Sequence, residues 1–314
     1  MIQALTYFLR RRLKRYILYS LRYPLWYWNS RQSRHITRQT RQGIFTFDSK
    51  DSGIGLYLFC FGEYETDLTK SVMDILKAEG RLNANSILLD IGANIGTTSV
   101  TILRSNAISK AIAVEPIAEN VELLRQNAKD NQLTERMLIR QLAISDKVGD
   151  VTMELNNSLH GDHRVRMSSS ISSSISLSSP SSSSTIDKQE LYQESSRPTV
   201  SAQSIPLDQL LSQESIAPSD IGLVWIDVQG HEGYVIKSGS ALFAQKPPTL
   251  IELWKYGIER SGMSIEAFCE LLSRHWSTCY LWKHGQFIKH ATSEIPKLIV
   301  GQKPSAFENV LLME

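Results

Sequence analysis

One stretch constrains the fold more than any other. Residues 86–100 read SILLDIGANIGTTSV, an apolar run that ends on an acid and enters a glycine turn. Small hydroxylated residues follow and lead into a helical pattern. In doubly wound α/β folds, a strand, a glycine turn and a helix place backbone N–H groups at the C-terminal edge of the sheet, where ligands bind. The stretch therefore predicts one wall of a nucleotide-type pocket.

The same alternation of short apolar strands and helices continues along the chain. Strands are expected at 86–90, 111–115, 137–145, 222–227 and 249–254, and helices at 95–105, 118–132, 232–243 and 264–275. Residues 53–62 also have a strand pattern, and 279–290 and 307–314 look antiparallel. Strands separated by helices imply parallel βαβ units. We predict an α/β fold with a doubly wound, mostly parallel sheet, an antiparallel C-terminal strand and a basic N-terminal helical arm.

The chain divides into an arm and one interrupted domain. We expect the arm at residues 1–47 and the domain at 48–314, with a serine-rich insertion at 165–198. Within it, 13 of the 17 residues at 168–184 are serine. Such a composition cannot bury enough apolar surface to offset chain entropy, so the insertion is predicted to be disordered.

The arm is strongly basic, with ten Lys and Arg and no Asp or Glu, whereas the remaining residues carry 24 basic and 32 acidic side chains. Apolar residues fall at helical spacing in its first part, and Tyr and Trp follow. Two interpretations stay open: residues 1–30 contact an anionic membrane surface, or they dock on their own domain or a partner subunit. Nucleic acid is not expected, because the body is acidic and no nucleic-acid-binding module is visible.

Cysteine usage and the N-terminus indicate the compartment. Cys60, Cys269 and Cys279 have no paired spacing, which predicts free thiols and no zinc site. Residues 1–30 contain no apolar run of about 18 residues, and arginines interrupt what would be a signal-peptide core. We expect a cytoplasmic protein, either free or peripheral at the inner face of the membrane.

The glycine turn argues against a dinucleotide. A pyrophosphate site needs G-x-G-x-x-G, whereas the turn has Gly92-x-Asn94-x-Gly96 and lacks the middle glycine. S-adenosylmethionine has no phosphates and needs only close approach of the backbone to its amino-acid and ribose portions. The turn therefore favours this cofactor.

Acids at three successive strand ends support the same cofactor. Asp90 would lie near its ammonium group, directly or through water. Glu115, at the tip of the next strand, would accept hydrogen bonds from both ribose hydroxyls. Asp146, after the third strand, would accept from the exocyclic amine of adenine.

These motifs resemble a known family. DIGANIG, followed by AVEP, AISD, SIPLDQLL and LVWIDVQGHEGYVIKSG, with GEYE before them and LIELW after them, is similar to the FkbM family of S-adenosylmethionine-dependent methyltransferases. The resemblance implies a Rossmann-like domain and O-methylation of glycan, glycolipid or secondary-metabolite hydroxyls. It also implies that Asp90, Gly92, Asn94, Gly96 and Glu115 contact the cofactor. The family often has Asp-x-Glu-Gly where this chain has Asp-Val-Gln-Gly at 227–230.

A hydroxyl acceptor must lose a proton, which calls for a general base or a metal. The candidate catalytic residues near the expected sheet edge are Asp227, His231, Glu232 and His163. Asp227, Glu232 and Glu252 carry the oxygen ligands that suit Mg²⁺, but their spacing does not establish a common site, and no metal is predicted.

Two other function classes remain open. Gln229 in place of the common Glu motivates a cofactor-binding or scaffolding protein with a non-catalytic methyltransferase fold. The other class is a nicotinamide-dependent oxidoreductase, because a ribose-binding acid alone fits NAD and S-adenosylmethionine equally well.

Overall fold

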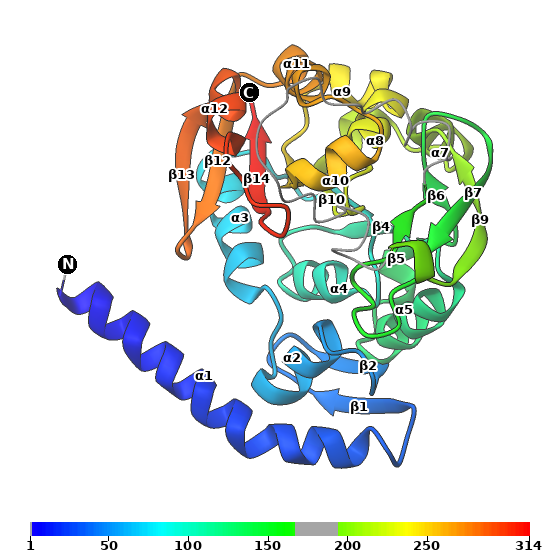
Figure 1. Ribbon diagram of the computed structural model, residues 1–314. Helices are drawn as coiled ribbons and strands as arrows, with labels where there is room; N and C mark the ends of the chain where they lie inside the picture. Colours follow the sequence, from blue (N-terminus) through cyan, green and yellow to red (C-terminus); the bar gives the residue numbers. More distant parts are fainter. Residues whose placement is uncertain (1, 167–193) are drawn as a thin grey trace, which may run out of the picture.

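The computed structural model describes residues 2–166 and 194–314 (Figure 1). Its centre is an eight-stranded sheet of order β13-β12-β14-β11-β10-β3-β4-β5. Strands β11, β10, β3, β4 and β5 run parallel, whereas β14, β12 and β13 form an antiparallel end. The strand bounds are β3 Ile87–Ile91, β4 Lys110–Val114, β5 Met137–Arg140, β10 Ile221–Ile226, β11 Thr249–Leu253, β12 Thr278–Lys283, β13 Gln286–Ala291 and β14 Glu308–Met313.

Helices cover both faces of this sheet. Because successive side chains of a strand point to opposite faces, Leu88 of β3 packs in one core with α2 to α5, and Leu89 packs in the other with α7 to α12. The predicted α/β class with a doubly wound, mostly parallel sheet is confirmed. The helix bounds are α2 Ile54–Phe61, α3 Thr66–Ala78, α4 Thr97–Arg104, α5 Ala118–Asp130, α7 Leu207–Gln213, α8 Glu232–Ser238, α9 Ser240–Ala244, α10 Lys255–Arg260, α11 Ile265–His275 and α12 Ile295–Ile299. Short 3-10 helices are η1 Thr134–Arg136, η2 Glu194–Ser196, η3 Pro218–Asp220 and η4 Thr292–Glu294.

The strand expected at residues 53–62 is wrong, because the segment forms helix α2. Its residues are apolar almost throughout, and such a run does not show whether the period is that of a strand or a helix. The Asp51 carboxylate accepts from the backbone N–H groups of Gly53 and Gly55 at 3.0 and 2.8 Å, which holds the start of the helix. Gly62 ends it in the left-handed conformation. The helix expected at 232–243 is likewise divided into α8 and α9.

A second, smaller sheet of order β6-β9-β7-β8 lies beside the carboxyl ends of β4 and β5 (Figure 1). The strand expected at 137–145 is therefore split, with β5 in the central sheet and β6 in this one. The bounds are β6 Ala143–Ile144, β7 Gly149–Glu154, β8 Arg164–Val165 and β9 Thr199–Ile205. The serine run at 168–184 lies outside the described residues, so its predicted disorder stays a prediction.

The N-terminal part forms helix α1, Ile2–Asn29, and a hairpin of β1, His35–Gln39, and β2, Ile44–Asp48. Asn127 of α5 and Asn131, just after it, bond the backbone of β2, with Asn127 Oδ1 accepting from the N–H of Thr46 at 2.7 Å. Phe45 and Phe47 are fully buried in the core that α2 to α5 share. Residues 44–47 of the expected arm therefore pack inside the domain. Within the described part of the chain, no helix is both long and apolar enough to cross a bilayer.

Candidate functional site

A cavity of about 280 Å³ opens at the carboxyl ends of the parallel strands. Acidic side chains stand at the ends of four adjacent strands, namely Glu252 in β11, Asp227 after β10, Asp90 in β3 and Glu115 after β4, and all four line it. The sheet thus brings residues that are up to 162 positions apart (252 minus 90) to one edge. Loops from the small sheet and the N-terminal end of α2 complete the wall.

Gly92 and Gly96 in the β3–α4 turn allow close contacts between this turn and neighbouring parts of the protein. Gly92 has φ +85°, and a Cβ added to it would lie 1.9 Å from the carbonyl oxygen of Asp227. Gly96 has φ +86°, and its added Cβ would lie 2.4 Å from Leu124 Cδ1. Gly92 lines the cavity, but Gly96 is outside its lining. The two glycines therefore let the turn approach β10 and α5, which sets the shape of the wall.

Asn94 takes the place of the missing middle glycine. It has φ +50°, a left-handed conformation that Asn tolerates better than most residues. Its backbone N–H donates to Glu115 Oε2 at 2.9 Å, and its side-chain amide donates to the carbonyl of His160 at 2.8 Å. Asn94 therefore joins the turn both to the end of β4 and to the loop between β7 and β8.

The Glu115 carboxylate is held in place by three donors. Besides Asn94, the backbone N–H of Ile117 and the side-chain amide of Asn120 donate to Oε1 at 3.0 and 3.2 Å. Glu115 is 4% exposed, and burial raises its pKa to about 7 although these hydrogen bonds lower it. Each carboxylate oxygen accepts more than one hydrogen bond, so the group can also accept from a ligand in the cavity.

Asp90 is even more enclosed, at 1% exposure. The Ser99 hydroxyl of α4 donates to its Oδ2 at 2.5 Å. Burial, together with the nearby Asp227 carboxylate, raises the pKa of Asp90 to about 7, although the hydrogen bond from Ser99 lowers it. A cationic group beside Asp90 would favour its ionised form.

Gln229 links two carboxylates on the other side of the cavity. Its side-chain amide donates to Asp227 Oδ1 at 2.7 Å and to Glu252 Oε2 at 3.0 Å. Burial raises the pKa of both acids, and for Glu252 the Asp227 carboxylate adds to the increase. A glutamate at 229 would place a third carboxylate between them, so the amide fits this site better.

Sequence reasoning did not identify Glu65 as a site residue. It lies before α3 with φ +50° and lines the cavity, where its charge raises the pKa of Glu252. Its position within GEYE, a segment that matches the family pattern, was the available signal. The bridging contacts of Gln229 gave no signal of their own, because they depend on where β11 lies.

The two residues at the start of α8 have different surroundings. Glu232 is fully buried and outside the cavity lining; its Oε1 accepts from the N–H groups of Val228 and Gly230 at 3.2 and 3.1 Å. His231 lines the cavity, with Nε2 3.1 Å from the Ser145 hydroxyl. Burial lowers the pKa of His231 to about 4, which keeps the ring neutral. The structure thus places Glu232 as a support for the 227–230 loop.

His163 lies in the cavity wall, and a backbone hydrogen bond determines which of its ring nitrogens carries the proton. Its Nδ1 accepts from the backbone N–H of Asn156 at 3.1 Å, and burial lowers its pKa to about 4. In a neutral ring that accepts at Nδ1, Nε2 carries the proton. His163 is therefore arranged to donate a hydrogen bond.

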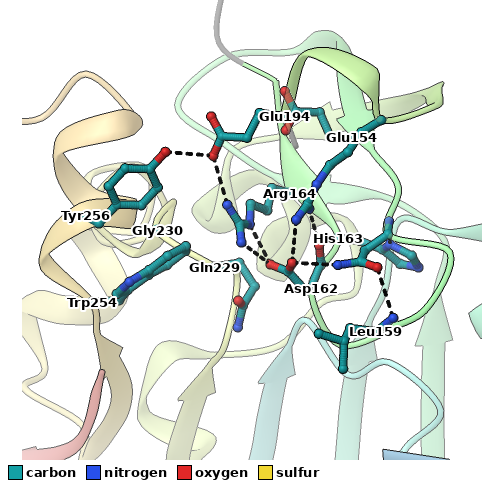
Figure 2. A network of polar contacts seen from close by, with 12 residues as sticks. Glu154, Leu159, Asp162, His163, Arg164, Glu194, Gln229, Gly230, Trp254 and Tyr256 are labelled. Carbon is teal, nitrogen blue, oxygen red and sulfur yellow. Dashed lines mark hydrogen bonds and ion pairs between the residues drawn. The ribbon is translucent and has the colours of Figure 1, made fainter. Parts of the chain in front are cut away.

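Figure 2 shows the ionic network beside His163. Arg164 is 2% exposed and pairs with Asp162 Oδ1 at 2.5 Å and with Glu194 Oε1 at 3.0 Å. Arg197 pairs with Asp162 Oδ2 at 2.6 Å, and the Tyr256 hydroxyl donates to Glu194 at 3.0 Å. The network joins Asp162 and Arg164, which precede the undescribed residues 167–193, to η2 and α10, which follow them.

Asp146 stands apart from the cavity. Its side chain is exposed and outside the lining, although Leu142, Ala143 and Ile144 just before it are part of the wall. Among the residues that the structure describes, no group of three or more His, Cys, Asp or Glu side chains could hold a metal ion.

Known proteins place the chain within one family. The family model of the methyltransferase FkbM domain matches residues 90–278, more than half of the chain. No curated protein matches the sequence.

Three solved structures align at low similarity. An FkbM methyltransferase from Methylobacillus flagellatus is 12% identical, with a TM-score of 0.39, over 72% of this chain and 44% of that chain. A tRNA m1G37 methyltransferase from M. jannaschii is 9% identical, with a TM-score of 0.38, over 90% and 55% of the two chains. A precorrin-6y C5,15-methyltransferase from Geobacter metallireducens is 11% identical, with a TM-score of 0.36, over 77% and 87%. The chain spans less than half the length of the first of these.

Proposed function

The chain belongs to the FkbM methyltransferase family, and on that premise we propose that it transfers a methyl group from S-adenosylmethionine to a hydroxyl of a glycan, glycolipid or secondary metabolite. The observation that carries the proposal is the row of carboxylates at the sheet edge. Asp90, Glu115 and Asp227 stand at the ends of three adjacent strands and line one cavity.

The residues present fit the proposed cofactor. Glu115 is oriented by three donors, as a carboxylate that binds a ribose diol needs to be. Asp90 is a buried acid beside it that would pair with the ammonium group of the methionine portion. When bound, S-adenosylmethionine supplies a methyl group that its positive sulfur has already activated. The protein contributes mainly by orienting the two reactants, an effect that reaches about 7–11 kcal/mol in well-aligned reactions.

Asp227 is the strongest candidate for the group that accepts the proton of the hydroxyl. It lines the cavity, the Gln229 amide fixes one of its oxygens, and burial raises its pKa. A raised pKa makes a carboxylate a better base. His163 is unsuited, because its Nδ1 is already occupied by a backbone N–H. His231 is a second candidate, since its Nδ1 has no hydrogen-bond partner among the residues that the structure describes.

Isothermal titration calorimetry with S-adenosylmethionine and S-adenosylhomocysteine tests the proposal. We expect saturable binding of both, weakened by about tenfold or more in Asp90→Ala and Glu115→Ala, because each removes a charge-assisted contact. Asp146→Ala is the matched control, since Asp146 is an exposed acid outside the cavity lining. A wild-type protein that binds neither compound at high micromolar concentration would refute the cofactor assignment.

A further inference from the structure

The described contacts between helix α1 and the domain come from one face of the helix. Arg15, Arg22 and Trp26 follow one another at intervals of seven and four residues, which places them on the same side of a helix. Arg22 donates to the carbonyl of Cys60 at 2.9 Å, and Arg15 pairs with Glu63 at 3.5 Å. Trp26 is 6% exposed in the core that α2 to α5 share. The arginines of this part of the helix therefore face the protein.

The opposite face of α1 is apolar and exposed. Leu13, Ile17 and Pro24, with Ser20 between Ile17 and Pro24, run along its middle at helical spacing, on the side away from Arg22. Leu13 and Trp28 are each 60% exposed. Among the α1 side chains that the structure describes, the exposed large apolar ones are Leu13, Tyr16, Ile17, Tyr19, Leu21, Tyr23, Leu25, Tyr27 and Trp28. In Figure 1 the N-terminal end of α1 extends away from the domain.

The charge and composition of the arm favour a lipid surface over a second copy of the chain as the binding partner of this face. Residues 1–47 carry ten basic and no acidic side chains, so the arms of two copies would repel each other if these faces paired. An anionic lipid surface attracts the same charge. Several Tyr side chains and Trp28 are exposed along α1, and these residue types favour the headgroup level of a bilayer. We infer that the face defined by Leu13, Ile17, Leu21 and Trp28 binds the surface of an anionic phospholipid bilayer, with α1 lying in the interface.

The attachment of α1 fixes where the cavity lies relative to that surface. Ile54, at the start of α2, lines the cavity, and Cys60, near its end, accepts from Arg22 of α1. The eight residues of α2 span about 12 Å. The bilayer and the proposed acceptor cavity would therefore be separated by the length of α2 and the thickness of α1, which is about 10 Å for a helix with its side chains.

Co-sedimentation with vesicles tests the inference on the full-length protein. We expect binding to an equimolar mixture of phosphatidylcholine and phosphatidylglycerol, little binding to phosphatidylcholine alone, and release as salt is raised. In Leu13→Glu/Ile17→Glu the partition into anionic vesicles should fall by at least about tenfold, because two apolar contacts are lost and two negative charges added.

The matched control is Val148→Glu/Val300→Glu, which makes the same change in charge at two exposed apolar residues outside α1. It should partition as the wild type does. Equal partition of the two double variants, or equal binding to neutral and anionic vesicles, would overturn the inference. So would light scattering that shows a wild-type dimer converted to a monomer by Leu13→Glu/Ile17→Glu, since the face would then bind a second copy. None of these readouts involves S-adenosylmethionine, so the result is independent of the proposed reaction.

Discussion

The side-chain amide of Gln229 donates to the Asp227 carboxylate over 2.7 Å. The same amide reaches Glu252 at 3.0 Å, so one neutral group separates two buried acids. The departure from the family's common glutamate is thereby compensated within this site, and it does not by itself argue for a non-catalytic protein.

Gln229→Glu should destabilise the protein in a pH-dependent way. The change replaces a shared donor with a third carboxylate, and we expect a loss of about 1–3 kcal/mol in the free energy of unfolding at pH about 8. At pH about 6 the loss should be smaller, because the acids of this cluster have raised pKa values and take up protons. Urea denaturation at both pH values measures this loss in the free energy of unfolding. Gln245→Glu, at an exposed glutamine, is the control; equal losses in both variants would contradict the role of the bridge.

Binding of S-adenosylmethionine should strengthen as pH rises through about 7. The pKa values of Asp90 and Glu115 are raised to about 7 in the free protein, whereas a cationic ligand and hydroxyl donors favour the ionised carboxylates. Below that pH, binding must release protons, so the dissociation constant increases as pH falls. Calorimetry in buffers of different ionisation enthalpy counts the protons. Uptake of protons on binding, or an affinity independent of pH between about 6 and about 8, would contradict the assignment.

Gly92→Ala should destabilise the fold more than a matched glycine substitution does. Its Cβ would meet the carbonyl oxygen of Asp227, in addition to the strain of a positive φ. Gly285 has a similar φ, +82°, but a Cβ added to it would meet no atom of the described residues within 4 Å, apart from its chain neighbours. We expect about 1–2 kcal/mol for Gly285→Ala and more than about 3 kcal/mol for Gly92→Ala, measured by chemical denaturation. Similar losses would show that the close approach to β10 is not tight in solution.

Variants of Glu232 should separate support of the loop from base catalysis. Gln keeps an oxygen that can accept from the N–H groups of Val228 and Gly230, whereas Ala does not. Glu232→Gln should therefore retain most of the thermal stability and methyl transfer, and Glu232→Ala should lose about 1–3 kcal/mol. If Glu232→Gln folds normally but loses its turnover while keeping cofactor affinity, the carboxylate itself takes part in the chemistry.

The strand-end acids could be placed from the sequence because parallel strands end at a common edge. Asp90, Glu115 and Asp227 each follow a recognisable apolar strand, and the structure brings all three to one cavity. The same reasoning placed Asp146 with them. It is exposed outside the lining, because the chain leaves the central sheet after β5 and enters the small sheet through β6.

Other features depend on packing that local patterns do not encode. His231 and Glu232 are adjacent in the sequence, yet one lines the cavity and the other is buried behind the loop, a difference set by the rotation of α8. The missing Cβ of Gly96 faces Leu124 of α5, which could not be known before α5 was placed. The apolar run at 53–62 fits a strand and a helix equally, and only the contacts at its ends decide between them.

The position of helix α2 bears on how a lipid-borne acceptor would reach the cavity. It has one end in the cavity wall and the other against α1. If α1 rests on a bilayer, the supply of a lipid-borne acceptor is governed by its surface density and lateral diffusion, and its bulk concentration no longer sets the rate. Turnover would then respond to the dilution of acceptor within the membrane plane, while dilution of the vesicles in solution would leave each bound enzyme equally well supplied.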